Sequence, residues 1–167
     1  MADGSQHPAS SCGPETVVER VVLDTHVVLD WLWFEDPRVR LLGQAIEAGH
    51  LQWMATADMR SELERVLVRL SHKGKSSLDK ERVLTSMDRW ACWVTASVPS
   101  WRFQCTDPDD QKFIDLALHG GARWLLSRDR AVLKLRARAR EMGCEFTTPE
   151  AVEWPALERQ RRPAGRL

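Results

Sequence analysis

The chain has 167 residues, in which 24 Lys and Arg balance 24 Asp and Glu, so its formal net charge is zero. This length fits one domain with a substantial core. The balanced charge gives the chain no overall attraction to nucleic acid, although a local basic patch would still attract it. The four cysteines show no Cys-x-x-Cys or Cys/His spacing, which argues against zinc and for free thiols in a reducing, cytoplasmic compartment. We find no apolar stretch long enough to span a bilayer and no apolar core of a secretory signal.

The two ends of the chain differ in composition from the middle. Residues 1–17 are rich in Ser, Gly and Pro and are predicted to form a disordered leader. Residues 154–167 combine arginines with prolines and a glycine and are predicted to form a flexible basic tail. The intervening residues 18–153 are predicted to form a single domain.

Short apolar runs alternate with amphipathic stretches within this domain. In chain order we expect a strand at 18–23, a helix at 37–48 that ends at Gly49, a strand at 51–55, helices at 57–70 and 78–90, a strand at 93–98, a helix at 109–118, a strand at 123–126, a basic helix at 130–142 and a strand at 144–147. Residues 71–77 are expected to form a flexible loop. Strands that alternate with helices predict an α/β fold whose mostly parallel sheet is covered on both faces.

Acidic residues follow two of the predicted strands. Asp24 comes directly after the apolar run 21–23, and Asp129 follows the run that begins at Trp124. Ligands of open α/β sheets bind outside the carboxyl ends of the strands, so both carboxylates are candidate ligands. Each is equally consistent with a helix N-cap, because an Asp side chain there accepts hydrogen bonds from the first backbone N–H groups.

Asp110 is distinguished from its acidic neighbours by periodicity. It shares a helical face with the apolar residues three, four and seven positions further on, so it is expected to turn toward the sheet. Asp107, followed by Pro108, has the pattern of an N-cap before a first-turn proline, and Asp109 that of a solvent-facing acid that favours the helix dipole. An acid on a packed face needs a partner, and a metal would supply one. Asp110 is therefore a predicted ligand, with Asp107 as an outside candidate.

The helix at 57–70 contributes two further acids, Glu62 and Glu64, which flank its apolar stripe on opposite sides. Spacing does not choose between them, and solvation is the usual fate of a helical Glu. Several carboxylates focused on one spot repel each other unless a divalent cation neutralises them, and Mg²⁺ and Mn²⁺ take oxygen ligands. The pattern predicts a carboxylate-lined metal site suited to phosphodiester hydrolysis.

Four motifs stand in order along the chain: Val-Leu-Asp24-Thr-His, Ser-Glu62-Leu-Glu-Arg-Val-Leu, Asp107-Pro-Asp-Asp110-Gln-Lys-Phe and Leu-Ser-Arg-Asp129. Together they resemble the PIN (PilT N-terminal) domain family, and the branch they look most like is the toxin component of toxin–antitoxin systems, related to VapC-like toxins. The resemblance runs from about Val18 to Val152. It implies a Rossmann-like three-layer α/β/α sandwich and an endoribonuclease that uses Mg²⁺ or Mn²⁺.

The resemblance also implies roles for individual residues. The catalytic acids would be Asp24, Glu62, Asp110 and Asp129. The three aspartates would hold one or two metal ions, and Glu62, chosen over Glu64 by the alignment of motifs, would orient a ligated water. Supporting positions would be Thr25, His26, Ser127 and Asp107.

One of these positions departs from the family. The family usually has Asp-Thr-Asn in the first motif, whereas this chain has Asp24-Thr25-His26. Asn bonds neutrally to a neighbouring carboxylate, while His can do so or carry a charge. We expect a packed, hydrogen-bonded His26 and not a histidine ligand, with an effect on metal affinity and pH response more than on the fold.

An RNA substrate would need positive charge beside the acids. The candidate contacts are Arg128, Arg130 and Lys134 around the helix that follows Asp129, and Lys73 and Lys75 in the loop at 71–77. A solvated basic helix is the commoner explanation of the first group. The resemblance adds two partners, a cognate antitoxin and a second copy of the chain in a homodimer.

Two other functions stay open. One is a catalytically weak PIN-like module that binds RNA or a protein without cutting, for which His26 and the neutral net charge are the only indications. The other is a housekeeping RNA-processing nuclease with the same chemistry. A small antitoxin gene beside the gene for this chain would favour the toxin instead.

Overall fold

The computed structural model describes residues 18–72, 77–95 and 104–154. The predicted leader, the tail from residue 155 onward, and the loop residues Lys73 and Lys75 lie outside these ranges. The domain boundaries at the two ends and the two loop lysines therefore stay predictions.

A parallel sheet of five strands forms the centre of the described chain, with the strand order β3-β2-β1-β4-β5. The strands are β1 (Glu19–Leu23), β2 (Leu51–Ala55), β3 (Ala91–Trp93), β4 (Trp124–Leu126) and β5 (Glu145–Thr147). Every pair of neighbouring strands in this sheet runs parallel. Strands β1 and β4 carry unbroken apolar runs because both faces of a parallel sheet are covered.

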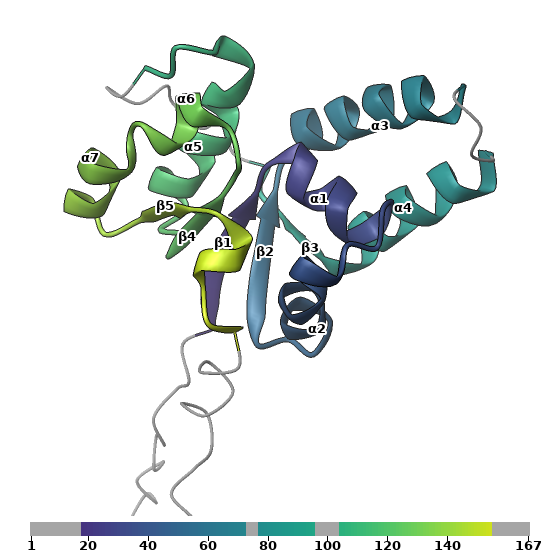
Figure 1. Ribbon diagram of the computed structural model, residues 1–167, viewed down its shortest axis with the longest axis horizontal. Coiled ribbons are helices and arrows are strands. Elements are labelled where there is room, and N and C mark those ends of the chain that lie inside the picture. The colour runs from purple at the N-terminus through teal and green to yellow at the C-terminus, as the bar shows by residue number, and fades with distance from the viewer. Residues whose placement is uncertain (1–17, 73–76, 96–103, 155–167) are drawn as a thin grey trace, which may run out of the picture.

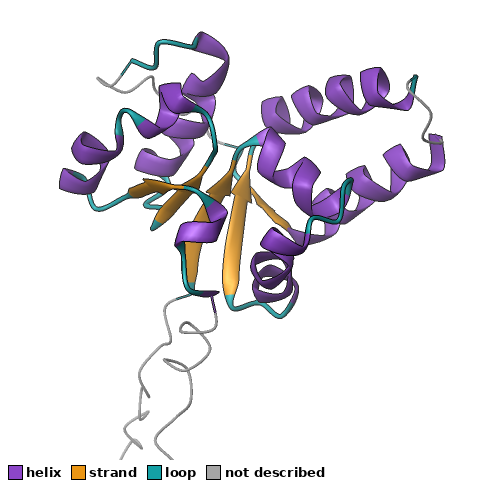
Figure 2. Ribbon diagram, in the orientation of Figure 1, coloured by secondary structure: helices purple, strands orange, loops and turns teal. Residues whose placement is uncertain are grey.

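Helices cover the sheet on both sides, as Figure 2 shows. They are α1 (Thr25–Leu32), α2 (Arg40–Glu47), α3 (Ala57–Ser71), α4 (Ser77–Trp90), α5 (Gln111–His119), α6 (Arg130–Leu133) and α7 (Arg136–Glu141), with 3₁₀ turns η1 (Pro37–Val39), η2 (Pro108–Asp110) and η3 (Pro149–Ala151). The predicted three-layer α/β/α fold with a parallel sheet is confirmed. In the described part of the chain, no helix has the length and apolar character needed to cross a membrane.

The strand order reverses beside β1. From β1 the chain passes through β2 to β3 on one side, and β4 and β5 then extend the sheet on the other side. Leu23 at the end of β1 is in register with Leu126 at the end of β4, so both strands finish at the same edge. In Figure 1, α1 and α3 stand on one side of this edge and α5 and α6 on the other. Such a switch point is where open α/β sheets bind ligands.

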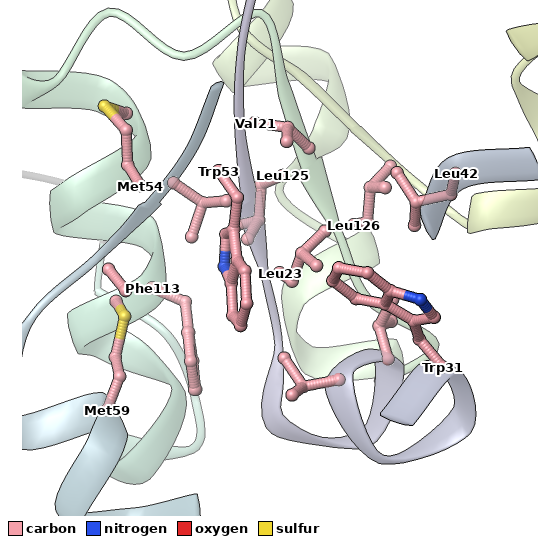
Figure 3. Close-up of a cluster of buried hydrophobic side chains, with 14 of the residues drawn as sticks. Val21, Leu23, Trp31, Leu42, Trp53, Met54, Met59, Phe113, Leu125 and Leu126 are labelled. Atoms are coloured by element: carbon pink, nitrogen blue, oxygen red, sulfur yellow. The ribbon is translucent and has the colours of Figure 1, made fainter. Parts of the chain in front are cut away.

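A buried aromatic cluster holds the helices that flank this edge. Trp31 of α1 and Trp53 of β2 meet edge to face, with ring centroids 5.7 Å apart and an interplanar angle of 63°. Figure 3 shows Trp53 between Phe113 of α5 and Leu23 of β1, and all three side chains are fully buried. Because α1 and α5 are packed in this way, the acids at their first turns are held at the edge of the sheet.

Most predicted elements agree with the structure to within a residue or two at their ends, and three differ more clearly. The single basic helix predicted at 130–142 is wrong: the N–H of Leu135 bonds to the carbonyl of Val132, three residues back, at 3.0 Å, and this 3₁₀ turn separates α6 from α7. The strand predicted at 93–98 begins earlier, at Ala91, where it pairs with β2, and residues 96–98 lie outside the described ranges. The helix predicted at 37–48 begins as the 3₁₀ turn η1 before α2 continues it.

The packing of α2 makes a test with its own control. Leu42→Ala should lower the free energy of unfolding by about 2–5 kcal/mol, because Leu42 is fully buried and its truncation leaves a cavity. The neighbouring Leu41 is 45% exposed, so Leu41→Ala should change the free energy by about 0.5 kcal/mol or less. Urea denaturation followed by circular dichroism measures both. Equal losses would show that α2 does not pack with this face.

Candidate active site

Asp24 lies between β1 and α1 and joins the two halves of the sheet. Its backbone N–H donates to the carbonyl of Leu126 in β4 at 3.0 Å. Its Oδ1 caps α1 by accepting from the N–H of His26 at 2.8 Å, and its Oδ2 accepts from the hydroxyl of Ser127. The N-cap alternative is thus confirmed for Asp24. It does not exclude metal binding, because each carboxylate oxygen has two lone pairs.

Asp24 is a buried residue that keeps its charge. Burial opposes ionisation, but the hydrogen bonds from the His26 side chain, from Ser127 and from the His26 backbone together hold the pKa of Asp24 below its usual value. The carboxylate is therefore negative throughout the neutral range. Ser127, which supplies one of these hydrogen bonds, is itself fully buried.

His26 lies beside Asp24 at the rim of the site. Its Nδ1 is 3.5 Å from Asp24 Oδ1, so the expected pairing with a carboxylate is present, but its side chain is 82% exposed. The expectation of a packed histidine is wrong, because α1 buries Val27 and Val28 and turns His26 outward. The hydrogen bond to Asp24 raises the pKa of His26 against the opposing effect of burial, and the negative charges of Asp24, Asp30 and Asp110 add to the rise.

Asp129 begins α6 directly after β4. Its Oδ1 accepts from the N–H of Ala131 at 2.6 Å, so Asp129 is also a helix N-cap, and the residue is exposed. The hydroxyl of Ser127 accepts from the N–H of Asp129 at 2.9 Å and donates to Asp24. Ser127 therefore links the two aspartates that follow β1 and β4.

Asp110 differs from the other acids because one of its oxygens is buried and has no hydrogen-bond partner within the described part of the chain. It ends η2 at the start of α5, and its Oδ2 is shielded from solvent without a hydrogen-bond partner. Burial, followed by the negative charges of Asp24, Asp129 and Asp107, raises the pKa of Asp110 to about 6, while Lys112 acts in the opposite direction. An unpaired, shielded carboxylate oxygen costs free energy, and a cation beside it would remove that cost.

Asp107 and Asp109 have the roles that the turn chemistry predicts. The Asp107 side chain accepts from the N–H of Asp109 at 2.9 Å, with Pro108 in the first position of η2. Both acids are exposed. Asp107 is thus a confirmed cap, and it affects the site through the repulsion that its charge exerts on Asp110.

The two glutamates of α3 have different neighbours. Glu62 Oε1 accepts from the hydroxyl of Thr25 in α1 at 2.7 Å, and Glu62 Oε2 is ion-paired with Lys112 of α5. Glu64 lies 3.6 Å from the ammonium group of Lys80 in α4. The structure therefore distinguishes the two glutamates, which their spacing in the sequence did not: Glu62 faces α1 and α5, and Glu64 faces α4.

We call Asp24, Glu62, Asp110 and Asp129 the acid cluster. Its donors are all oxygens, and the unpaired oxygen of Asp110 fits a hard divalent cation. The cluster is not a closed ligand shell, however. Within the described ranges, no three His, Cys, Asp or Glu side chains form a group that could hold a metal ion as they stand. Oxygens of Asp24, Glu62 and Asp129 are instead engaged in caps and hydrogen bonds.

The basic residues expected to contact RNA have two different environments. Arg128 is ion-paired with Asp30 of α1 and with Glu150 of η3, so its guanidinium ties the turn between Ser127 and Asp129 to those two elements. Arg130 and Lys134 are exposed on and just after α6. Arg128 thus has a structural partner on each side, whereas the other two are accessible.

An open groove of about 840 Å³ lies along α3 and reaches Lys112, the ion-pair partner of Glu62, but its described lining contains none of the four acids of the cluster. Its cations are Arg65 and Arg69 of α3 and Lys112 of α5, and it also contains Asp58 and Glu64. None of these three cations was among the predicted RNA contacts. Their signals were present, because the two arginines are spaced i, i+4 on one helix face and Lys112 follows Asp110 by two positions in the third motif.

A comparison with family models adds an independent finding. A model described as a PIN domain matches residues 20–131, about two thirds of the 167-residue chain. The matched span contains every member of the acid cluster. No curated protein and no solved structure matches the chain in the corresponding comparisons.

The raised pKa of Asp110 predicts a pH-dependent stability. The folded state binds the Asp110 proton more tightly than the unfolded state, in which the pKa of this carboxyl group is near 3.8. Protonation therefore stabilises the fold fully below about pH 4, and this stabilisation is lost as the pH rises through about 6. Asp110→Asn removes this loss. In EDTA, the melting temperature of the variant relative to wild type should therefore increase between about pH 4 and about pH 8.

The matched control is Asp109→Asn, which neutralises the exposed neighbour on the same turn. Its melting temperature relative to wild type should show no comparable trend. If Asp110→Asn also shows no trend, the carboxyl group of Asp110 is not repelled by the acid cluster as described.

Proposed function

The chain belongs to the PIN domain family, whose members are in general nucleases, and from this premise we propose that it is a metal-dependent endoribonuclease. The proposal depends most on Asp110: its Oδ2 has no hydrogen-bond partner among the described residues, and burial together with the charges of neighbouring carboxylates raises its pKa to about 6. A strongly perturbed acid at the switch point of a parallel sheet is a functional-site signal. A purely structural protein would have no use for such a perturbed acid at this position.

We assign the metal ligands to Asp24, Asp110 and Asp129, and the cofactor to Mg²⁺ or Mn²⁺. Both ions favour oxygen donors, and the three carboxylates come from separate elements that meet at one edge of the sheet. When bound, the metal supplies a nucleophilic water at neutral pH and neutralises charge on the scissile phosphate.

The remaining residues of the site position these groups. Thr25 holds Glu62 by its hydroxyl at 2.7 Å, and Glu62 orients the attacking water. Ser127 fixes Asp24 and the backbone of Asp129 through its one hydroxyl group. His26, whose pKa is raised, adds positive charge at the rim as the pH falls and so weakens metal binding there.

The RNA substrate would lie in the groove along α3. Arg65, Arg69 and Lys112 place positive charge on that groove, and Arg130 and Lys134 are exposed on the other side of the sheet edge. Contacts from such residues to phosphates give affinity without sequence choice. The preference for RNA comes from the resemblance to the toxin branch of the family.

We further propose that the protein is the toxin of a type II toxin–antitoxin pair, similar to VapC-like toxins, that acts in the cytoplasm as a homodimer and is inhibited by a cognate antitoxin. The order of the four motifs supports this assignment. A housekeeping RNA-processing nuclease would use the same acid cluster. A catalytically weak binding module is favoured by the histidine at the usual Asn position and by Glu62, both of whose carboxylate oxygens are already engaged.

Cleavage of labelled single-stranded RNA tests the proposal. Wild type should cut in Mg²⁺ or Mn²⁺ and not in EDTA. Asp110→Asn should reduce the rate by roughly 10²-fold or more, because a charged group that acts on the transition state is removed. Asp109→Asn should retain the wild-type rate, since Asp109 is exposed and outside the acid cluster.

The pair of variants separates the possible functions. If both variants cut like wild type, the acid cluster is not the active site. If folded wild type neither cuts RNA nor binds metal in a calorimetric titration, the binding module is the correct function.

The toxin assignment has a test in cells. Induced expression of wild type in a bacterial host should arrest growth, and Asp110→Asn should not, because the arrest requires cleavage. Co-expression of a small protein encoded beside the gene should restore growth. Growth unaffected by an active enzyme would favour the housekeeping nuclease.

A further inference from the structure

Lys112 places an ammonium group between Glu62 of α3 and the turn that precedes α5. Its Nζ is ion-paired with Glu62 Oε2 and donates to the backbone carbonyl of Asp109. The same atom lies 4.8 Å from the centre of the Phe113 ring, and the Lys112 side chain is only 26% exposed. An anion, a carbonyl and an aromatic face thus hold this lysine in one position, unlike a solvated lysine.

Glu62 is fully engaged as a consequence. Thr25 donates to one of its oxygens, Lys112 pairs with the other, and the Glu62 side chain is 23% exposed. The negative charge of Glu62 is therefore balanced from within the chain. Asp110, two residues before Lys112, feels the same ammonium charge, which opposes the repulsion from the other acids.

The charges left for an external cation are consequently those of the three aspartates. Asp24 already accepts hydrogen bonds from the His26 backbone and from Ser127, whereas Asp110 Oδ2 has no hydrogen-bond partner among the described residues. A second divalent ion that used Glu62 as a ligand would have to lie beside the ammonium group of Lys112, which already pairs with Oε2. Two divalent ions side by side would also repel the fixed ammonium group of Lys112.

We infer that Lys112 is a positioning residue that holds Glu62 against Thr25 and takes the place of a second divalent cation, so that the acid cluster binds a single metal ion. This inference rests on the proposed function, because it requires the aspartates to bind a metal. It reduces the proposed one or two metal ions to one, and it gives a positioning role to Lys112, which was not among the predicted site residues.

The stoichiometry of Mn²⁺ binding tests the inference without measuring activity. The full chain of wild type, titrated calorimetrically and by electron paramagnetic resonance, should bind one Mn²⁺. Lys112→Met frees Glu62 and removes the internal cation, so this variant should bind two. Lys112→Arg keeps a cation beside Glu62 and should bind one.

A matched control comes from the other side of α3. Lys80 lies 3.6 Å from Glu64 in the same kind of Lys–Glu pair, away from the acid cluster. Lys80→Met should therefore leave the stoichiometry at one ion. A change in this variant equal to that in Lys112→Met would overturn the inference, because loss of any Lys–Glu pair on α3 would then suffice.

The outcomes distinguish the inference from the proposed function. Two ions in wild type, or one ion in a folded Lys112→Met variant, would overturn the role of Lys112 and leave the metal-dependent nuclease intact. The absence of Mn²⁺ binding by wild type would overturn both together. Two ions in wild type would overturn the inference even if Lys112→Met fails to fold.

Discussion

Repulsion between carboxylates at one edge of the sheet is the constraint on which the site depends. Asp24, Asp110 and Asp129 come from three connections, and the parallel strands bring them to the same edge. The fold compensates each charge differently. Asp24 is hydrogen-bonded, Asp129 is exposed, and Asp110 has a buried oxygen that no described residue pairs with. Burial of the Asp110 carboxylate and the remaining repulsion on it lower the stability of the fold, and a bound cation would reverse both effects. Such a loss of stability is typical of functional sites.

Internal cations carry part of this compensation. Lys112 balances Glu62, and Arg128 is held between two carboxylates on either side of the turn that bears Asp129. A chain with zero net charge can thus combine an acidic site with fixed positive groups beside it, because what matters locally is the distribution of charge and not its sum. The same arrangement explains why the exposed cations Arg130 and Lys134 are better placed than Arg128 to meet a substrate.

Periodicity and turn chemistry predicted most of the fold and the caps, because these are local effects. The apolar runs of β1 and β4, the cap at Asp107 and the inward turn of Asp110 all follow from residues within one or two turns of each other. Periodicity and turn chemistry could not predict the contacts between elements that are distant in the sequence. The partners of Glu62 and Glu64 come from other helices, and the exposure of His26 depends on which face α1 buries. The break between α6 and α7 rests on one backbone hydrogen bond at Leu135 that no side-chain pattern marks.

The most direct measurement is the anomalous scattering of manganese in a crystal of the protein soaked in MnCl₂. We expect a peak bonded to Asp110, at about 2.1 Å from its oxygen, with Asp24 or Asp129 as a further ligand directly or through water. A peak at that place would establish that the unpaired oxygen is a metal ligand. A well-ordered crystal in which the acid cluster holds no manganese, or in which manganese binds only elsewhere, would contradict the account.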